Sequence, residues 1–415
     1  MRIAIVHDYF TQMGGAEKVA EELFRLEPGA DVFATVALEE CLPPLLRGVP
    51  IKTSWMQRLP WLKKLYRFYF LLYPLGVSTL DLRGYGCILS SSSGYAKGVR
   101  IPRHAVHVCY CHTPMRWVWS YDKYSERESM GGALRWLIAQ AISSLRFWDL
   151  KASRQPDHFV ANSQVVAERI QKAYGRYAHV IHPPIDVNRF SLSDKQGDYY
   201  LVLARLVPYK RIDLAVQACT NLGKRLVVIG GGPDLPALRK IAGPTVEFAG
   251  RLSDKEVERY AAECKALLFP GEEDFGMAPV EVAAAGRPTI AFRAGGAMET
   301  VIEGQTGLFF DEPTPESLAD AIQRFEQQTW SQEVLRTHAE HFSIEVFQQR
   351  MREFLIRVGV PLDQAERVRQ PQPVTAQAKV RRQVTTNISA TAVAAGSPAG
   401  FTAKSPTNAS SSRTH

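Results

Sequence analysis

Several patterns that mark common classes of enzyme are missing from this sequence. It has no G-x-G-x-x-G pattern, which argues against a dinucleotide-dependent oxidoreductase. Its six cysteines are scattered and form no C-x-x-C pair, as is typical of a reduced, cytosolic protein. Cys109, Cys111 and His112 lie close together, but no second group of ligands at zinc spacing accompanies them, so we expect no metal site. A D-x-D triplet, which would bring a divalent metal to a diphosphate, is also absent.

Long apolar runs are absent as well. No stretch approaches the roughly 18 apolar residues that a membrane-spanning helix needs. The opening "MRIAIVHDYF" has too short an apolar run for a signal peptide, and no small-residue cleavage site follows it, so we predict a strand there. Because 46% of the 415 residues are apolar, the chain can still form two sizeable cores. These features predict a cytoplasmic protein.

Acidic residues are missing from two segments. Residues 370–415 contain five basic residues and no acid, and thus carry five of the eight net positive charges. This tail is rich in Ala, Ser, Thr, Gln and Pro, a composition that predicts disorder. It has almost no aromatic residues for base stacking, and no recognition motif appears, so no nucleic-acid partner is expected. Residues 41–80 contain six basic residues and no acid.

Strands and helices alternate along two successive stretches. The first contains predicted strands at "RIAIVHDYF", "ADVFATV", "GCILSSS", "AVHVCYCH" and "DHFVANS". The second alternates from "DYYLVLARL" to "GLFF". This order predicts an α/β fold with two Rossmann-like, doubly wound parallel-sheet domains that face each other across a cleft. We place these domains at 1–183 and 184–342, followed by a helix at 343–360 that returns to the first domain and the disordered tail at 370–415.

The stretch "EEDFGMAPVEVAAAGRPTI" follows a buried apolar strand and carries two glutamates. A helix is predicted to start near Met277, since a proline two residues later fits only the first turn. Phe275, Gly276 and Met277 then lie at a helix N-terminus, whose free N–H groups attract anions and polar ligands. Glu281 lies roughly 6 Å further along the helix. Glu273 and Glu281 can therefore reach one ligand, although a solvated acidic turn before a surface helix would give the same pattern.

Cations and glycines occupy other predicted strand ends. Arg205 and Lys210 follow the first strand of the second domain, where two cations can hold a diphosphate in the absence of a metal. Gly14 and Gly15 lie in the first strand-to-helix loop and permit close approach of a phosphate or sugar. His112 directly follows a strand and can orient a hydroxyl or accept a proton. A structural histidine and an exposed basic loop remain the alternatives.

Taken together, these segments resemble the family 4 glycosyltransferases, retaining enzymes with the GT-B fold. The resemblance covers roughly residues 1–355, and the E-x7-E spacing from Glu273 to Glu281 is its most specific part. The matching segments are "MGGAE", "CHTP", "VANSQ", "PPIDVNRF", "LARLVPYKRIDLAV", "VIGGGP" and "EDFGMAPVEVAAAGRPTIA".

The resemblance implies a role for each matching residue. Glu273 lies by the donor sugar hydroxyls, Glu281 binds the nucleotide ribose, Arg205 and Lys210 hold the diphosphate, and His112 lies by the reacting sugar. The donor site is further expected to include Gly14, Gly15, Arg251, Phe275, Gly276 and Met277. The chain departs from many members at Arg211, where they have glycine.

The resemblance also implies a reaction. A hexosyl group, expected to be mannosyl from GDP-mannose, passes from a nucleoside-diphosphate sugar to a saccharide or lipid-linked saccharide in bacterial surface polysaccharide or glycolipid assembly. No cofactor and no metal are expected. Two alternatives stay open: a non-catalytic nucleotide-sugar-binding protein, and a sugar-nucleotide epimerase of the same fold.

Residues 55–76 predict contact with a membrane surface. They mix aromatic and basic residues, the composition of an interfacial helix on anionic lipid, and Pro60 limits that helix to a start near Trp61. We expect a peripheral contact with the inner face of the cell membrane. Residues 134–151 form a second amphipathic candidate. The alternative is that both segments simply pack on the sheet of the first domain.

Overall fold

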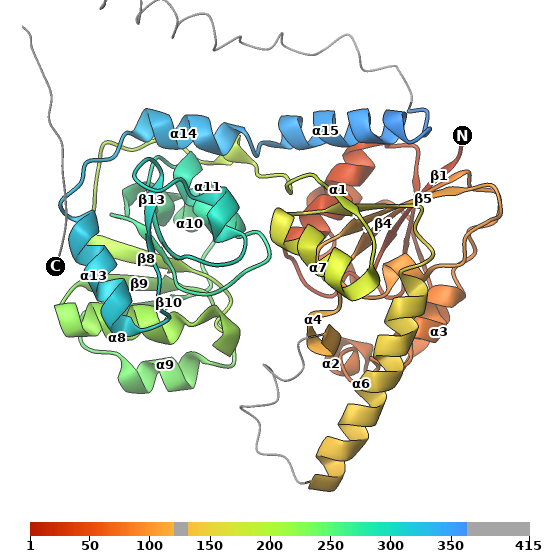
Figure 1. Ribbon diagram of the computed structural model, residues 1–415, viewed down its shortest axis with the longest axis horizontal. Helices are drawn as coiled ribbons and strands as arrows, with labels where there is room; N and C mark the ends of the chain where they lie inside the picture. Colours follow the sequence, from red (N-terminus) through yellow and green to blue (C-terminus); the bar gives the residue numbers. More distant parts are fainter. Residues whose placement is uncertain (120–131, 363–415) are drawn as a thin grey trace, which may run out of the picture. The chain divides into compact units, whose positions relative to one another are not determined.

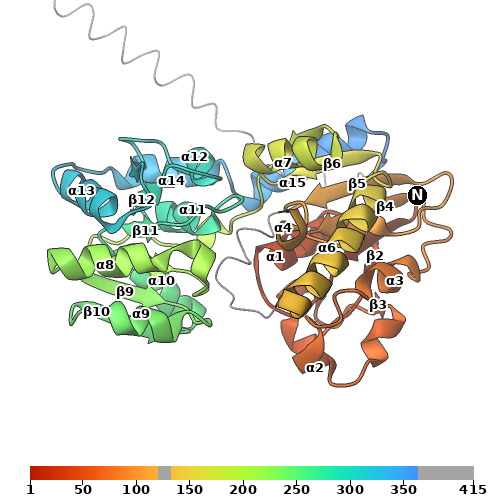
Figure 2. The same cartoon turned by 60° about the horizontal axis from the view of Figure 1, so that its bottom comes forward.

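Two parallel β-sheets, joined by helices, make up the part of the chain that the structure describes (Figures 1 and 2). The computed structural model describes residues 1–119 and 132–362, and both sheets belong to one unit, Met1–Leu362. The predicted tail at 370–415 lies outside the described residues.

The first sheet has seven strands in the order β3-β2-β1-β4-β5-β6-β7. All neighbouring pairs are parallel. The strands are β1 (Ile3–His7), β2 (Asp31–Ala34), β3 (Ile51–Thr53), β4 (Cys87–Ser92), β5 (Val106–Cys111), β6 (His158–Ala161) and β7 (Ala178–Val180). The associated helices are α1 (Gly15–Leu26), α2 (Leu62–Leu65), α3 (Tyr73–Ser78), α4 (Arg116–Trp119), α6 (Gly132–Ala152) and α7 (Gln164–Tyr174).

The second sheet has six parallel strands in the order β10-β9-β8-β11-β12-β13. They are β8 (Tyr199–Leu203), β9 (Arg225–Ile229), β10 (Val246–Gly250), β11 (Leu267–Phe269), β12 (Thr289–Phe292) and β13 (Gly307–Phe310). The helices are α8 (Ile212–Leu222), α9 (Leu235–Ile241), α10 (Asp254–Glu263), α11 (Met277–Ala284), α12 (Ala297–Thr300), α13 (Pro315–Phe325) and α14 (Gln332–Glu340).

Successive residues of each central strand pack into different cores. In β1, Ile5 belongs to the cluster that contains α1, whereas Val6 faces the cluster on the other side of the sheet. In β8, Leu201 and Tyr200 likewise belong to two different hydrophobic clusters. Successive side chains of a strand point to opposite faces of the sheet. A strand that is buried on both faces therefore needs apolar residues at every position. This explains why the predicted strands read as continuous apolar runs.

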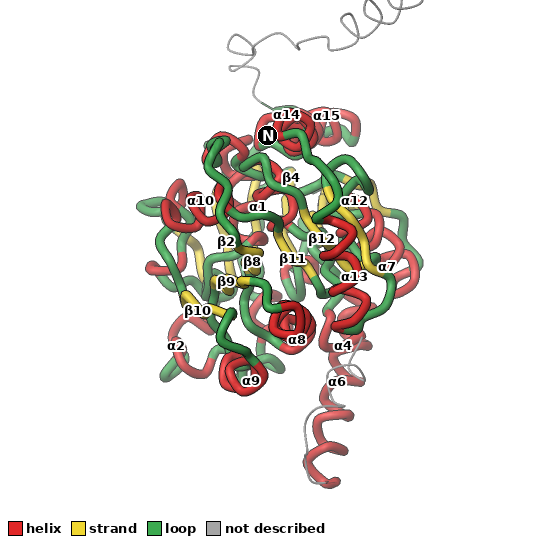
Figure 3. The backbone as a smooth tube through the Cα atoms, turned by 90° about the vertical axis from the view of Figure 1, so that its left-hand side faces the viewer, coloured by secondary structure: helices red, strands yellow, loops and turns green. Residues whose placement is uncertain are grey.

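Helix α15 (Ile344–Arg357) packs against the first sheet, although it follows the second sheet in the sequence. Its side chains Phe347, Met351 and Leu355 are buried in the cluster that contains Ile5. Before it, α14 places Leu335 in a core of the second sheet. Figure 1 shows α14 and α15 one after the other along the chain, and Figure 3 shows both at the top of the view.

Most predicted elements are present, but several helices and two short strands were missed. The predicted strands correspond to β1, β2, β4, β5, β6 and β8–β13, and the helix expected near Met277 begins at that residue. The sequence analysis missed β3, whose three residues are only partly covered, and helices α13 and α14. Strand β7 (Ala178–Val180) was not predicted either.

The helix predicted to start near Trp61 is present only in part. Helix α2 begins at Leu62, directly after Trp61, whose backbone is left-handed with φ of 46°. It ends after a single turn, and the rest of the segment forms a 3-10 turn at Trp55–Arg58 and the separate helix α3. Met56 and Tyr73 are buried in one cluster, so tertiary packing divides the segment.

Candidate functional site

The site begins at the point where the strand order of the second sheet reverses. The chain runs outward from β8 to β9 and β10, then returns to place β11 on the other side of β8. In such sheets, ligands bind outside the carboxyl ends of the strands at this switch point. The loop after β8 carries Lys210, and the loop after β11 carries Glu273.

Lys210 and Glu273 form an ion pair across this switch point. The Nζ atom of Lys210 lies 2.5 Å from Oε1 of Glu273, and both side chains are mostly covered. Gly271 permits this approach, because a Cβ on it would lie 2.7 Å from the Cα of Lys210. Two predicted functional residues, 63 positions apart, therefore meet directly.

Helix α11 begins beside this pair, as predicted. Gly276 precedes it with φ of 84°, a conformation that strongly favours glycine, and within the described residues no side chain caps the helix. Phe275 is buried in the core of the second sheet, and Met277 is the first helical residue. The free backbone N–H groups of this first turn therefore point away from the helix next to Glu273.

A loop of the first sheet meets the start of α11. A Cβ on Gly15 would lie 2.6 Å from Sδ of Met277, so a larger residue at Gly15 requires a shift of that side chain. Nearby, Nζ of Lys18 lies 3.3 Å from Oε1 of Glu281. The structure thus brings Gly15, Met277 and Glu281 together, and it adds Lys18, which the sequence analysis missed. The "GGAEK" run offered only a weak signal for that lysine.

Two further glycines, also missed, support the E-x7-E loop. Gly295 and Gly296 follow β12, and the N–H of Gly296 donates a 2.8 Å hydrogen bond to the carbonyl oxygen of Glu273. A Cβ on Gly296 would overlap the backbone of Phe275. The paired glycines after a strand were the available sequence signal for this close approach.

The remaining predicted cations lie at other loops. Arg205 is exposed after β8, and its Nη1 donates a 3.4 Å hydrogen bond to Oε1 of Gln12 in the glycine loop of the first sheet. Arg251 is exposed after β10, beside the glycine turn that follows β9, where a Cβ on Gly231 would lie 3.6 Å from its Nε. The structure joins Arg205 to the Gly14 loop, whereas Arg251 lies beside Gly231.

His112 directly follows β5 and is buried, with 8% of its surface exposed. Its Nε2 shares a 2.8 Å hydrogen bond with Oγ of Ser91 on β4. Burial, with the neighbouring His7 as a second cause, lowers the pKa of His112 to about 3. The imidazole is therefore neutral at physiological pH, and it can orient a hydroxyl through a hydrogen bond.

Asp274, adjacent to Glu273, connects the E-x7-E loop to the first sheet. Its carboxylate pairs with Arg169 on α7 and with Arg116 on α4. The hydroxyl of Ser163 also donates a 2.6 Å hydrogen bond to its backbone carbonyl. The sequence analysis missed this contact, because nothing local distinguishes an acid that pairs with distant arginines from a solvated one.

Glu299 on α12 makes a second connection to the first sheet. Its carboxylate accepts hydrogen bonds from the backbone N–H of Gln164 at 2.9 Å and of Val165 at 3.4 Å, at the start of α7. It also lies 3.0 Å from Nε2 of His182. A carboxylate at a helix N-terminus is stabilised by the free N–H groups and the helix dipole.

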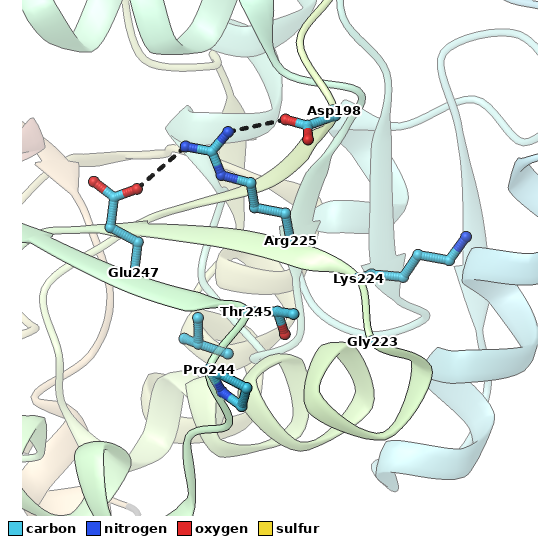
Figure 4. A pocket seen from close by; sticks show the side chains of 8 residues that line it. Asp198, Gly223, Lys224, Arg225, Pro244, Thr245 and Glu247 are labelled. Carbon is cyan, nitrogen blue, oxygen red and sulfur yellow. Dashed lines mark hydrogen bonds and ion pairs between the residues drawn. The ribbon is translucent and has the colours of Figure 1, made fainter.

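A cavity of about 460 Å³ lies at the opposite edge of the second sheet (Figure 4). Arg225 and Val246, the first residues of β9 and β10, line it, so it opens at the amino ends of these strands. Figure 4 shows Arg225 between Asp198 and Glu247, with contacts of 3.0 and 3.5 Å. This cavity is not the expected donor site, because it lies at the amino ends of the strands and its charged side chains pair with one another.

Family comparisons agree with this geometry. The model "Glycosyltransferase Family 4" matches residues 13–189, and "Glycosyl transferases group 1" matches residues 185–342. The chain belongs to the family 4 glycosyltransferases. The resemblance stated from the sequence is therefore confirmed.

Curated relatives of this glycosyltransferase chain match over part of their length. The GDP-mannose-dependent alpha-(1-6)-phosphatidylinositol monomannoside mannosyltransferase of Mycobacterium tuberculosis is 31% identical over 192 residues, which are 39% of this chain and 50% of the relative. The D-inositol 3-phosphate glycosyltransferase of a Nocardioides species is 28% identical over 208 residues, or 40% and 45% of the two chains. The chain thus spans about half the length of these relatives.

Solved structures show the same fold. Anabaena Alr3699/HepE in complex with UDP has a TM-score of 0.63 at 18% identity, over 86% of this chain and all of that one. Sucrose-phosphate synthase of Thermosynechococcus elongatus has a TM-score of 0.64 at 16% identity, over 86% and 99% of the two chains. The predicted fold class of the glycosyltransferase, two Rossmann-like parallel sheets of the GT-B type, is confirmed.

The described residues contain neither a membrane-spanning helix nor a metal-ligand cluster. Within residues 1–119 and 132–362, no helix has the length and apolar character needed to cross a bilayer. In the same residues, no three His, Cys, Asp or Glu side chains gather as a metal site would require. The six cysteines, all within these ranges, are unpaired.

Proposed function

We propose that the protein is a retaining glycosyltransferase that moves a hexosyl group, mannosyl in our proposal, from a nucleoside-diphosphate sugar to a saccharide or lipid-linked saccharide. The Lys210–Glu273 ion pair at the switch point, beside the uncapped start of α11, carries this proposal. It places a cation, a carboxylate and free N–H groups at the position where α/β sheets bind ligands.

The chemistry divides between the two charges of that pair. When a donor enters, Lys210 and the exposed Arg205 neutralise the charge that develops on the departing diphosphate. Glu273 accepts hydrogen bonds from sugar hydroxyls, and Glu281 accepts them from the ribose. Cations then take the role of a divalent metal, so transfer is expected to continue in the presence of EDTA.

Front-face displacement is the proposed route of transfer. In this route the acceptor hydroxyl attacks C1 on the side from which the diphosphate leaves, and the departing phosphate oxygen takes the hydroxyl proton. The C1–O bond to phosphate breaks as the new C1–O bond forms, and the anomeric configuration is retained. No carboxylate nucleophile is required, which leaves Glu273 free to bind the sugar.

GDP-mannose is the proposed donor. The mannosyltransferase of Mycobacterium tuberculosis, similar over 39% of this chain, is GDP-mannose-dependent. Anabaena Alr3699/HepE, which shares the fold, binds UDP. The two relatives favour different bases, so donor choice requires a direct comparison of GDP- and UDP-sugars.

The decisive experiment measures release of GDP or UDP from a panel of donor sugars, with membrane lipid extract as acceptor. Transfer with a retained anomeric linkage, read by NMR of the product, supports the proposal. Binding of a nucleotide sugar without release of nucleotide would instead indicate a non-catalytic binder. Conversion of the donor to its epimer without transfer would indicate an epimerase. Complete loss of transfer in EDTA, restored by Mn²⁺, would refute metal independence.

A peripheral membrane contact through residues 55–76 remains part of the proposal in altered form. Trp61 and Phe68 are 77% and 75% exposed, and Lys64 and Arg67 are exposed near them. Lys63 contributes less than expected, because its Nζ lies 2.6 Å from Oε1 of Glu40. Exposed aromatics beside cations that form no ion pair within the described residues suit the headgroup region of anionic lipid, where each cation contributes about 1 kcal/mol.

Sedimentation with phosphatidylglycerol vesicles tests this contact. The combined change Trp61→Ala and Phe68→Ala, and separately Lys64→Glu with Arg67→Glu, should each release the protein at low salt. The matched control is Arg239→Glu with Lys240→Glu on α9 of the second sheet. Wild-type protein that stays in the supernatant at low salt would show that this surface does not bind lipid.

A further inference from the structure

Three adjacent strands of the first sheet bring together polar side chains that the proposed chemistry does not yet use. β1 ends at His7, β4 contains Ser91, β5 is followed by His112, and β4 lies beside both β1 and β5. Oγ of Ser91 lies 3.1 Å from Nδ1 of His7 and 2.8 Å from Nε2 of His112. Ser91 is fully buried and His7 nearly so, whereas His112 keeps 8% exposure. The hydroxyl therefore links two imidazoles, and His112 is the end nearer to solvent.

Glu17, in the first turn of α1, lies at the other end of this group. Its Oε1 is 3.9 Å from Nε2 of His7, and both side chains are 3% exposed. Its Oε2 has no hydrogen-bond partner within the described part of the chain. That oxygen faces Gly14, where a Cβ would lie 3.0 Å away. A carboxylate buried with so few partners is costly, which points to a role beyond packing.

The Ser91 hydroxyl has a single proton and can donate to only one of the two imidazoles, so two arrangements use that proton within the group. In the first, His112 donates from Nε2 to Ser91, Ser91 donates to Nδ1 of His7, and His7 keeps its proton on Nε2, toward Glu17. In the second, each hydrogen bond is reversed, and His7 turns the lone pair of Nε2 toward the carboxylate. Two facing acceptors repel each other, so a negatively charged Glu17 favours the first arrangement.

We propose that Glu17 is a positioning residue that acts through His7 and Ser91 to keep the proton of His112 on Nε2, so that Nδ1 offers a lone pair to a hydroxyl of the bound sugar. This inference rests on the proposed glycosyltransferase function. The low pKa of His112, caused by burial and by His7, keeps the ring neutral, and a neutral imidazole has one donor and one acceptor nitrogen.

The tautomer matters because it decides what His112 recognises. A lone pair on Nδ1 accepts a hydrogen bond from a hydroxyl, whereas an N–H there would require an acceptor atom. A sugar hydroxyl held as a donor at His112 keeps its own oxygen lone pairs available to other groups. The fixed tautomer thus orients the sugar without any change in the charge of the site.

Nitrogen NMR of histidine-labelled protein tests this proposal directly. In the wild type, the His112 signals should show a protonated Nε2 and an unprotonated Nδ1. Glu17→Gln keeps the size of the side chain but removes its charge, and should shift His112 toward the other tautomer. It should also lower kcat about tenfold or more, as expected when an orienting carboxylate is lost, with a smaller change in KM for the donor. Ser91→Ala, which removes the bridge, should shift the same signals.

Glu22→Gln is the matched control. Glu22 is also buried on α1, but it accepts hydrogen bonds from Arg25 and Gln348. This variant should leave the His112 signals unchanged. If Glu17→Gln and Ser91→Ala both leave those signals unchanged, the proposal is overturned. The tautomer can be read without turnover, so a wild type that transfers no sugar would refute the proposed function separately.

Discussion

Lys210 Nζ lies 2.5 Å from Glu273 Oε1 although the two residues come from different loops of the second sheet. Each neutralises the other in the absence of ligand, with little exposure of either side chain. When a donor binds, its diphosphate would replace Glu273 as the partner of Lys210, and its sugar hydroxyls would replace Lys210 as the partner of Glu273. Both charged side chains would then keep polar partners throughout binding.

Lys210→Met should reduce kcat by about 100-fold or more, because a preorganised cation acts on charge that develops in the transition state. The donor Kd should change less. Steady-state kinetics and calorimetry together separate the two effects. Lys224→Met is the matched control, since Lys224 forms a similar pair with Glu326 at 2.7 Å, away from the site. A weaker donor Kd with an unchanged kcat would instead show that Lys210 binds the ground state and the transition state equally.

Glu281→Gln should weaken donor binding by roughly 1–3 kcal/mol, because the ribose hydroxyls lose a charged acceptor. Lys18→Met should have a smaller effect, since Lys18 is 43% exposed and its pair with Glu281 is screened by solvent. Calorimetric titration with the nucleotide measures both. Wild-type affinity in Glu281→Gln would remove Glu281 from the ribose site.

Asp149→Asn should destabilise the first sheet by about 3–5 kcal/mol, because it leaves a buried cation unpaired. Lys97 Nζ lies 2.5 Å from Asp149 Oδ1, and both side chains are at most 1% exposed. Trp119 and Tyr174 each donate a 2.7 Å hydrogen bond to the other oxygen of Asp149. Chemical denaturation provides the measurement. The exposed pair of Asp81 and Arg83 is the control, and Asp81→Asn should leave the unfolding midpoint unchanged.

Stability should fall as the pH is lowered from 7 to 5, partly through His107. Burial lowers the pKa of His107 to about 4, below its ordinary value of 6.5. Between these values the unfolded chain binds a proton that the folded chain does not, so protonation favours unfolding. The free energy of unfolding should decrease by about 2 kcal/mol per such histidine over this range. His107→Asn should reduce the pH dependence of urea unfolding; an unchanged dependence would contradict this assignment.

The sequence by itself determined much of the local structure. Apolar runs located the central strands, because strands buried on both faces need apolar residues at every position. The start of α11 followed from Gly276 and Pro279, whose backbone preferences act within a few residues. Strand ends then indicated which loops carry the site, since parallel strands share a carboxyl edge. Lys210, Glu273, Met277 and Glu281 were predicted as site residues in this way, and the structure pairs the first two.

Only the tertiary structure decided which of these residues meet. Lys18 pairs with Glu281 across 263 positions, and Asp274 pairs with Arg169 across 105. The contact of Ser91 with His7 and His112 depends on β4 lying between β1 and β5. Such pairs follow from strand order and from how the helices pack. Neither backbone preference nor hydrophobic period, which act over a few residues, specifies them.

The segment 55–76 shows most clearly which properties follow from the sequence and which depend on tertiary packing. The segment is rich in aromatic and basic residues, but the helix predicted from this composition forms only one turn, in α2. Burial of Met56, Leu62 and Tyr73 in a common cluster outweighs the local preference for a continuous helix. Composition follows from the sequence alone. The direction of each side chain, by contrast, depends on packing against residues far away in the chain. Packing decides because burial of apolar surface contributes more free energy than helix propensity does.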